Sequence, residues 1–208
     1  MTAPTLVLLV RHGLTPTTGL TLPGRAPGLH LAEAGRRQAE AAGARIARLG
    51  GVAAVYTSPL ERARETGAAI ARACRLKARV EPGLNEVQIG RWTGLSLAKV
   101  RRKPEWRSVL RHPSGFRFPD GESFPEMQAR VGEALQRLCE RHPGETIVAV
   151  SHGDPIKAAV AFALGVPLDL FNRIVIAPAS VTAIAFRPSG PFVLTVNSSD
   201  GDLAGLGG

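Results

Sequence analysis

The chain has 208 residues and a formal net charge of +9, with 44% hydrophobic and 21% charged residues. This composition is that of a globular protein, and the length suits one domain, with or without an inserted cap. Aromatic residues make up only 5% of the chain, so base-stacking platforms for nucleic acid are scarce, and a small anionic partner better explains the positive charge.

The N-terminal segment, MTAPTLVLLVRHG, has no basic region before its apolar run. That run is too short for a signal peptide or a membrane span, so we expect a cytoplasmic protein with neither a membrane nor a nucleic-acid partner. The two cysteines, Cys74 and Cys139, stand in no metal-binding or redox motif. We expect them to be buried small hydrophobic residues rather than a disulfide or a metal pair.

The first predicted strand is an apolar run that stops at a cation, an imidazole and a glycine, Arg11-His12-Gly13. Such a run fits a strand buried on both faces, and polar groups at its carboxyl end fit the ligand-binding edge of a parallel sheet. A Gly/Pro-rich loop follows over 14–30. The helices and strands predicted over residues 6–80 are a strand at Leu6–Val10, a helix at Leu31–Leu49, a strand at Val52–Tyr56, a helix at Leu60–Ala73 capped by Thr57-Ser58-Pro59, and a strand at Lys77–Val80.

The regular pattern breaks between Glu81 and Pro119 into Gly- and Pro-rich segments with two short helices, near Ser96–Arg102 and Glu105–Leu110. We expect an inserted segment over about 82–119, because excursions of this length usually carry function. The later elements predicted are a helix at Gly121–Arg141 capped near Asp120, a strand at Thr146–Val150, a helix at Asp154–Leu164, closing strands at Ile174–Ile176, Val181–Phe186 and Phe192–Val196, and a flexible tail over 198–208. The alternation predicts one α/β sandwich domain over 1–197, with at least one closing strand antiparallel.

The ends of two predicted strands carry the same pattern. Ser151-His152-Gly153 follows an apolar strand, just as Arg11, His12 and Gly13 follow the first one. Each histidine alone could be an ordinary structural residue at a strand end. Together, two such strands can deliver both imidazoles to one crevice, so we expect His12, His152 and Gly153 to contact the same ligand.

Two further side chains are candidates for the same edge of the sheet. Arg62 lies in the first turn of a helix that follows a strand, where its planar guanidinium can grip a phosphate, whereas we take Arg64 to be a solvated helix charge. Glu86 stands between Leu84 and the glycine-flanked Trp92. This setting suits a partly buried carboxylate with a raised pKa, as a general acid needs near neutral pH.

With these residues, the chain resembles the histidine phosphatase superfamily, which includes cofactor-dependent phosphoglycerate mutases and many phosphatases. The motifs that carry the resemblance are Arg11-His12-Gly13, Gly24-Arg25, 31–39 (LAEAGRRQA), 58–63 (SPLERA), Leu84-Asn85-Glu86, Gly121-Glu122-Ser123 and Ser151-His152-Gly153. The resemblance implies a phosphoglycerate mutase-like fold, which is a three-layer α/β/α sandwich with a mostly parallel sheet and a phosphate pocket at its carboxyl edge.

The resemblance also implies a mechanism. His12 would become phosphorylated, while Arg11, Arg62 and His152 would bind the phosphoryl oxygens. Glu86 would protonate the leaving oxygen and then deprotonate the attacking water. The resemblance implies neither a metal nor a cofactor, makes a small phosphorylated anion the partner, and leaves a homodimer open.

The chain departs from the family pattern at a few positions. Many members carry an asparagine where this chain has Thr18, and we take the hydroxyls of Thr15 and Thr18 as candidate phosphate contacts. Mutases commonly follow the acid with an arginine and a tyrosine, whereas 87–89 reads VQI here, which favours a phosphatase. A phosphomutase is the alternative, and a phosphate-binding module without turnover is the second. Glu122 either supports the site from behind its contact residues or caps the long helix that it opens, and we favour the cap.

The inserted segment is strongly basic over 99–117. Its cations are Lys99, Arg101, Arg102, Lys103, Arg107, Arg111 and Arg117, against the single acid Glu105. Two interpretations stay open: a lid that selects substrates with more than one charged group, and a solvated basic surface.

Overall fold

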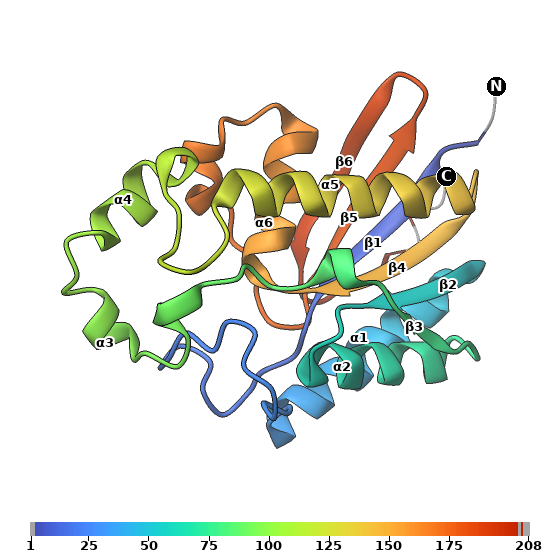
Figure 1. Ribbon diagram of the computed structural model, residues 1–208. Helices are drawn as coiled ribbons and strands as arrows, with labels where there is room; N and C mark the ends of the chain where they lie inside the picture. The colour runs from blue at the N-terminus through green and yellow to red at the C-terminus, as the bar shows by residue number, and fades with distance from the viewer. Residues whose placement is uncertain (1–2, 204, 206–208) are drawn as a thin grey trace.

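The computed structural model describes residues 3–203 and 205. Its six-stranded sheet has the order β3-β2-β4-β1-β5-β6 and is covered by helices on both faces (Figure 1). The strands are β1 (Thr5–Arg11), β2 (Val52–Thr57), β3 (Ala78–Val80), β4 (Thr146–Ser151), β5 (Val181–Arg187) and β6 (Gly190–Ser198). The α-helices are α1 (Glu33–Leu49), α2 (Glu61–Ala73), α3 (Leu97–Val100), α4 (Trp106–Arg111), α5 (Phe124–Arg141) and α6 (Gly153–Leu164). Four short 3-10 helices are η1 (Pro82–Leu84), η2 (Gly90–Trp92), η3 (Pro113–Gly115) and η4 (Leu168–Arg173).

The register of the sheet determines where the polar strand ends lie. Strands β3, β2, β4 and β1 run parallel, and β5 and β6 close the sheet in antiparallel pairings. Arg11 is aligned with Ser151 across β1 and β4, so the residues that follow them leave the sheet side by side. The predicted α/β fold, with a mostly parallel sheet and antiparallel closing strands, is confirmed.

Strand β1 is the centre of two hydrophobic cores. Leu8 and Val10 face a core that includes Ile70 of α2 and residues of α1, whereas Leu9 faces the core that contains residues of α5 and α6. All five residues predicted for this strand are buried. Since burying a large apolar side chain stabilises a fold by about 1.5–3 kcal/mol, this strand anchors the three layers, as its apolar run predicted.

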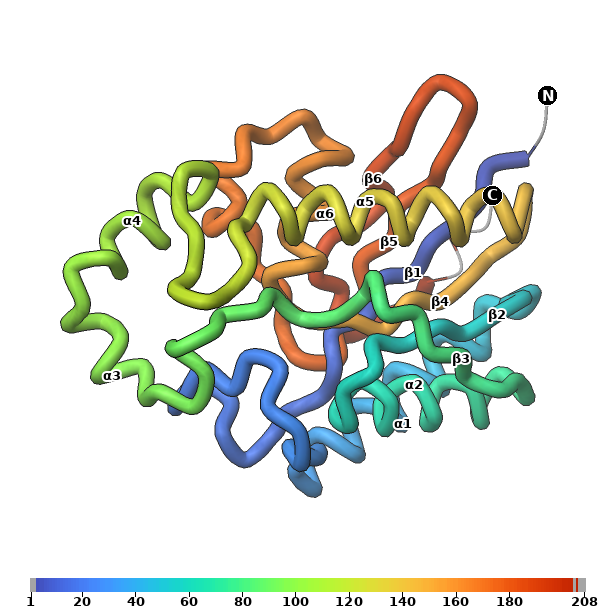
Figure 2. Tube along the Cα trace, in the orientation of Figure 1, coloured from blue at the N-terminus to red at the C-terminus, as the bar shows by residue number. Residues whose placement is uncertain are grey.

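The chain between β3 and α5 leaves the sheet. It contains η1, η2, α3, α4 and η3 and extends past the carboxyl ends of the strands, on the left in Figures 1 and 2. An aromatic cluster packs it against the body of the protein. In that cluster the ring centroids of Trp92 and Phe118 lie 5.3 Å apart and those of Phe118 and Phe124 lie 5.4 Å apart. The segment therefore has its own apolar packing directly beside the carboxyl edge of the sheet.

Two predicted helix starts differ from the structure. Helix α5 begins at Phe124 and not at residue 121, because Ser123 and Glu126 form a capping box, while Asp120 lies in a turn with a φ of 57°. The N-cap of α2 is Leu60, with no side-chain cap. The hydroxyl of Ser58 that was expected to cap α2 lies instead 2.7 Å from a ring nitrogen of His152.

Two segments in the last part of the chain also differ from expectation. Ile174–Ile176 forms no strand, and the carbonyl of Ile176 accepts a hydrogen bond from Arg11 instead of pairing in the sheet. In the predicted tail, the guanidinium of Arg45 donates to carbonyls over 198–201, and Leu203 is buried. Residues 198–203 are thus packed on the domain, and the rest of that prediction, at 204 and 206–208, falls outside the described residues.

The structure also bears on the predicted state of the cysteines and on membrane-spanning helices. Cys74 and Cys139 are free thiols, as expected, but they are only partly buried. Among residues 3–203 and 205, no helix combines the length and the apolar character that crossing a bilayer requires.

Candidate active site

The structure brings the two predicted histidines together at the carboxyl edge of the sheet. His12 follows β1, His152 follows β4, and their ring centroids lie 5.1 Å apart. Their exposed fractions are only 7% and 0%. The pairing of the two strand ends, inferred from a repeated sequence pattern, therefore places both imidazoles in one buried position.

Hydrogen bonds assign the proton on the His12 ring. Its Nδ1 lies 2.8 Å from the carbonyl oxygen of Gly13, so we assign the proton to Nδ1 and the lone pair to Nε2. Burial, followed by the charge of Arg62, lowers the pKa of His12 to about 3. The ring is therefore neutral near pH 7, and its unprotonated Nε2 can act as a nucleophile or acceptor.

His152 is held in the complementary form. Its Nε2 lies 2.7 Å from the hydroxyl oxygen of Ser58, and we assign the hydroxyl as donor, which leaves an N–H on Nδ1. Burial, together with the neighbouring His12 and Arg62, lowers the pKa of His152 well below its usual value. His152 can thus donate one hydrogen bond from Nδ1 without carrying a full charge.

Two arginines, one fully buried and one partly buried, face these rings. Arg62, in the first turn of α2, is completely buried, and its Nε lies 3.3 Å from Nε2 of His12 while Nη2 donates to the carbonyl of Gly24 at 2.8 Å. Arg11 donates from Nη1 to the carbonyl of Ile176 at 2.6 Å. The charges of both arginines act on the pKa of His12 and of His152, which places all four groups in one electrostatic neighbourhood.

Three donors of this group have no protein partner. Nε of Arg11, Nη1 of Arg62 and Nδ1 of His152 are buried and make no hydrogen bond among the described residues. An unpaired buried donor costs about 1–3 kcal/mol or more when charged, so three in one place indicate a site built for an anion. Helix α6 begins at Gly153 and adds its N-terminal dipole.

The remaining predicted phosphate contacts lie close by but are less directly supported. A Cβ on Gly153 would lie 3.7 Å from the guanidinium carbon of Arg11, so the main chain passes closely along that side chain. The hydroxyl oxygens of Thr15 and Thr18 lie 2.9 Å apart, and that of Thr18 accepts a hydrogen bond from the Thr15 amide. The contacts described for these threonines organise their own loop, and their role in phosphate binding stays a prediction.

The predicted acid lies beside His152. Oε1 of Glu86 accepts from the amide of Val87 at 2.9 Å, and Oε2 lies 3.9 Å from Nδ1 of His152. Burial, followed by the charge of Asp154, raises the pKa of Glu86 to about 7. A carboxyl group with this pKa can give up and take back a proton near neutral pH.

Several residues around the site were not identified as functional from the sequence, or were given another role. Glu122 was expected to cap α5, but its carboxylate pairs with Arg25 and Arg130 and accepts from the amide of Gln88. The Gly-Glu-Ser motif was the signal that could have found it. Asp154 had no motif of its own, and only its position two residues after His152 points to the site.

Thr66 was missed as well. Its hydroxyl accepts from the amide of Gly13 at 3.1 Å and donates to the carbonyl of Arg62 at 2.8 Å. It thereby ties the loop after β1 to the first turn of α2. The sequence signal for it was weak, because a threonine one turn after Arg62 is an ordinary helix residue.

A cavity of about 310 Å³ opens beside Glu86. Its lining residues are Leu22, Pro23, Gly24, Glu86, Val87, Ile89, Trp106, Val109, Leu110, Phe118, Phe124, Asp154, Lys157 and Asn172. The basic stretch 99–117 contributes Trp106, Val109 and Leu110, whereas Arg101 and Arg102 are exposed and line no part of this cavity. Of the two interpretations left open for this stretch, a solvated basic surface therefore fits the structure better than a basic lid.

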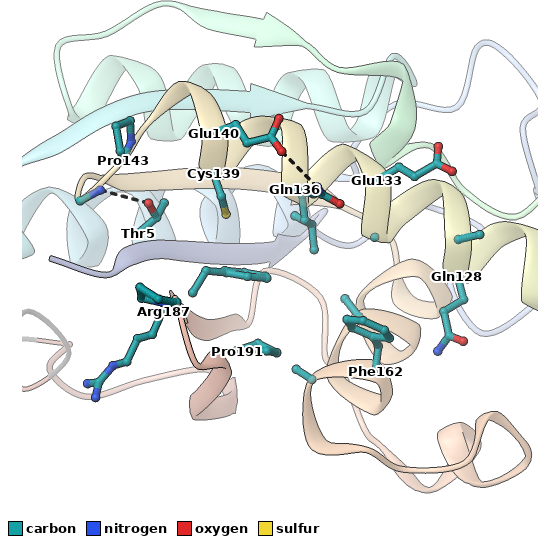
Figure 3. A pocket seen from close by; sticks show the side chains of 18 of the residues that line it. Thr5, Gln128, Glu133, Gln136, Cys139, Glu140, Pro143, Phe162, Arg187 and Pro191 are labelled. Atoms are coloured by element: carbon teal, nitrogen blue, oxygen red, sulfur yellow. Dashed lines mark hydrogen bonds between the residues drawn. The ribbon is translucent and has the colours of Figure 1, made fainter. Parts of the chain in front are cut away.

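A larger groove of about 870 Å³ lies elsewhere, between α5, α6 and the β5–β6 hairpin (Figure 3). Gln136 and Cys139 lie on one wall, Phe162 and Pro191 on the other, and no candidate site residue lines it. Among the described residues, no cluster of three or more histidine, cysteine or acidic side chains has the arrangement of a metal site.

The chain was compared with known proteins. A model of the histidine phosphatase superfamily (branch 1) matches residues 7–199. A bifunctional protein of Mycobacterium tuberculosis is 37% identical over 190 residues, covering 90% of this chain and 52% of that protein, so the chain spans about half the length of this curated relative. Phosphoserine phosphatase 1 of Hydrogenobacter thermophilus is 31% identical over 196 residues, covering 92% of this chain and 91% of that protein. The solved structure of Bacillus stearothermophilus YhfR has a TM-score of 0.87 at 28% identity, with 93% of this chain and 97% of that chain covered.

Proposed function

The chain belongs to the histidine phosphatase superfamily, and from that premise we propose that it hydrolyses phosphomonoesters through a phosphohistidine on His12. One observation carries the proposal: buried, unpartnered N–H groups of Arg11, Arg62 and His152 lie around an unprotonated Nε2 of His12. A phosphoryl group would accept hydrogen bonds from all three donors, and charge-assisted bonds of this kind are strong.

In the first proposed step, Nε2 of His12 attacks phosphorus and the bond between phosphorus and the ester oxygen breaks. Glu86, protonated, gives its proton to that oxygen, which leaves as an alcohol. The raised pKa of about 7 supports this role, because an ordinary glutamate would be almost wholly ionised at neutral pH. Arg11 and Arg62 would neutralise the charge on the equatorial oxygens, which is the main requirement of phosphoryl transfer.

In the second proposed step, a water molecule attacks the phosphorus atom of the phosphohistidine. The water gives its proton to the Glu86 carboxylate, the bond between phosphorus and Nε2 breaks, and inorganic phosphate and neutral His12 are formed. A nucleophile that splits one displacement into two lets a single carboxyl group act first as acid and then as base. Two guanidinium groups and an imidazole N–H are the charge-neutralising groups in this scheme, and we propose turnover without an added metal ion.

The cavity beside Glu86 supports a substrate class. Its walls are mostly apolar, its charged lining side chains are Glu86, Asp154 and Lys157, and Nζ of Lys157 donates to Asp154 at 3.2 Å. No arginine lines it among the described residues. We therefore propose small phosphomonoesters whose alcohol carries a carbon skeleton and at most one further charged group.

The test is a panel of phosphomonoesters assayed for phosphate release without added metal, with wild type and His12→Ala side by side. We expect release from small alkyl and aryl phosphates and a loss of at least ~10³-fold in the variant, as for removal of a covalent nucleophile. Turnover that survives in the variant would rule out the phosphohistidine route. Conversion of 3-phosphoglycerate to 2-phosphoglycerate at a rate above hydrolysis would instead make the protein a mutase.

A further inference from the structure

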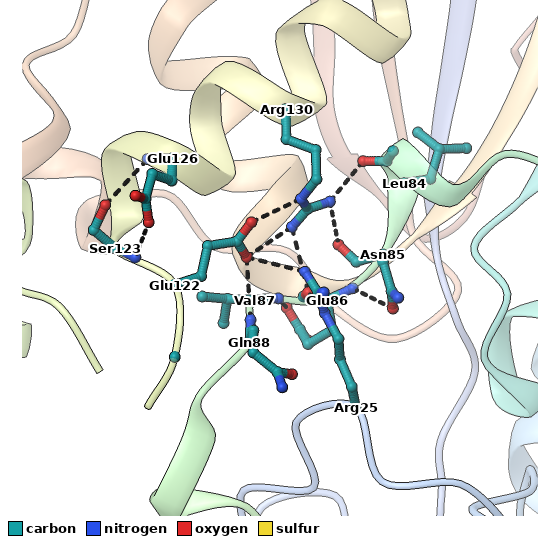
Figure 4. A network of polar contacts seen from close by, with 12 residues as sticks. Arg25, Leu84, Asn85, Glu86, Val87, Gln88, Glu122, Ser123, Glu126 and Arg130 are labelled. Carbon is teal, nitrogen blue, oxygen red and sulfur yellow. Dashed lines mark hydrogen bonds and ion pairs between the residues drawn. The ribbon is translucent and has the colours of Figure 1, made fainter. Parts of the chain in front are cut away.

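The carboxylate of Glu122 lies between two arginines behind the candidate acid (Figure 4). Its Oε2 accepts from Nη2 of Arg25 at 3.0 Å and from Nη2 of Arg130 at 3.0 Å, and its Oε1 accepts from Nε of Arg130 at 2.8 Å. The Glu122 side chain is 13% exposed. Both oxygens thus accept hydrogen bonds from arginine side chains.

The two arginines also donate hydrogen bonds to the main chain that carries the acid. Nε of Arg25 donates to the carbonyl of Glu86 at 2.6 Å. Arg130 donates from Nη1 to the carbonyls of Gly83 and Asn85 at 2.7 and 3.1 Å. On the far side of the acid, Oε2 of Glu122 accepts from the amide of Gln88 at 3.1 Å. The main chain on both sides of Glu86 is therefore held by one charged group of three side chains.

The same group reaches the second half of the site. Arg25 follows Gly24, whose carbonyl accepts from Nη2 of Arg62 at 2.8 Å. Through Arg25, the carboxylate of Glu122 thus connects the segment that carries Glu86 to the loop that holds the buried Arg62. The three members of the group come from separate parts of the chain, since Arg25 lies in the loop after β1, Glu122 in the segment before α5 and Arg130 in α5.

We propose that Glu122 is a positioning residue for the reaction: through Arg25 and Arg130 it fixes the backbone at Glu86, so that the acid is kept at the leaving-group side of His152. This inference rests on the proposed function. Glu122 touches no reacting atom, so it acts only through the placement of Glu86. A misplacement of a reacting group by about 1 Å can cost roughly 100-fold in rate.

A purely structural ion-pair cluster is the competing explanation, and leaving-group dependence separates the two. A displaced acid slows esters whose leaving oxygen needs a proton and hardly affects esters with a good leaving group. General destabilisation lowers the activity toward both esters equally. The ratio of kcat/KM for an alkyl phosphate to kcat/KM for 4-nitrophenyl phosphate is therefore the readout, because kcat/KM covers the steps up to formation of the phosphoenzyme.

The experiment compares Glu122→Gln with Glu126→Gln in the full chain. Glu126 is a matched control, since it lies four residues further on, pairs with Arg117 and accepts from the Ser123 amide, but contacts nothing in the acid segment. We expect Glu122→Gln to lower kcat/KM for the alkyl phosphate about 10- to 100-fold and to lower it for the aryl phosphate less than about threefold. Glu126→Gln should leave both values unchanged.

Arg25→Gln serves as a second variant in case Glu122→Gln does not fold. It removes the shorter of the two hydrogen bonds to the Glu86 carbonyl, while the longer one from Arg130 at 3.4 Å and the pair between Glu122 and Arg130 remain, and we expect the same selective loss on the alkyl phosphate. Equal losses on both esters, or no loss, in either variant would overturn the positioning role. That result leaves the proposed function intact as long as His12→Ala abolishes turnover of both esters.

Discussion

Replacing Glu86 with glutamine should remove the alkaline limb of the pH profile for alkyl phosphate hydrolysis. The pKa of Glu86 is raised from 4.5 to about 7, first by burial and then by the charge of Asp154. A carboxyl group with this pKa is about half protonated at pH 7 and about 1% protonated at pH 9. At its ordinary pKa it would already be less than ~1% protonated at pH 7. The structure therefore places the acid so that it works just below neutrality.

The sign of the pH effect follows from the role of the proton. Formation of the phosphoenzyme needs protonated Glu86, so kcat/KM of the wild type should fall as pH rises above about 7, by roughly 50-fold between pH 7 and 9. Glutamine gives no proton, and general acid catalysis contributes about 10²- to 10⁴-fold. The variant should therefore be slower by that factor near pH 6, and its profile should be flat where the wild type declines.

The assay measures kcat/KM between pH 5.5 and 9 with an alkyl phosphate, for wild type, Glu86→Gln and Asp154→Asn. Removing the charge of Asp154 eases ionisation of Glu86, so Asp154→Asn should keep the alkaline limb but move it to lower pH. An alkaline limb that persists unchanged in Glu86→Gln would refute the assignment of the acid. A limb that moves to higher pH in Asp154→Asn would refute the electrostatic explanation of its pKa.

Further predictions concern the anion site, the histidine orientation and the inserted segment. Arg62→Lys should lower kcat/KM about 10²- to 10³-fold, because an ammonium group cannot reproduce the forked hydrogen bonds of the buried guanidinium. Arg64, which is exposed on the same helix, is the control, and Arg64→Lys should have no effect. Steady-state kinetics measure both variants, with circular dichroism as the folding control. Ser58→Ala should lower kcat/KM about 10-fold, because the ring of His152 loses the hydrogen bond that fixes its tautomer. The nitrogen chemical shifts of this ring should change in the variant, and unchanged shifts would contradict the assigned role of Ser58. The double variant Arg101→Gln/Arg102→Gln should leave KM unchanged for both a multiply charged phosphate and an aryl phosphate. Trp106→Ala should raise KM for the aryl phosphate, because Trp106 lines the cavity. A rise in KM for the multiply charged phosphate alone in the double variant would instead support the basic lid.

The sheet and its ligand-binding edge were predictable because local signals were strong there. Apolar runs mark β1 and β4, and the two His-Gly pairs directly follow them, so parallel pairing alone brings His12 beside His152. Arg62 was predictable for a similar reason, since the first turn of a helix after a parallel strand faces the same edge.

The parts that could not be predicted depend on contacts between distant segments. The pattern around Glu122 fits a helix start, and only the tertiary structure brings Arg25 and Arg130 to its carboxylate. The Ser58 hydroxyl serves His152 instead of capping α2, because a buried ring nitrogen competes for the same group. Likewise, the carbonyl of Ile176 is used by Arg11, which explains why a β-branched triplet forms no strand.

The orientation of the side chains in the inserted segment also could not be predicted from the sequence. Its basic residues dominate the composition, but composition does not reveal which side of a short helix faces inward. In the structure, Trp106 and Val109 of α4 face the cavity, whereas the arginines around them are exposed. The exposed arginines fit the solvated basic surface, one of the two interpretations left open, while the apolar periodicity of only six residues was too short to predict which side chains of α4 line the cavity.

The central claim is that Nε2 of His12 carries the phosphoryl group during turnover. The direct measurement is to mix the protein with a phosphomonoester labelled in its phosphate, quench in alkali within milliseconds, and locate the label by mass spectrometry. The account predicts a labelled His12 that loses its phosphate on a chase and is absent in His12→Ala. Label on any other side chain, or steady turnover with His12 unlabelled at every time point, would contradict it.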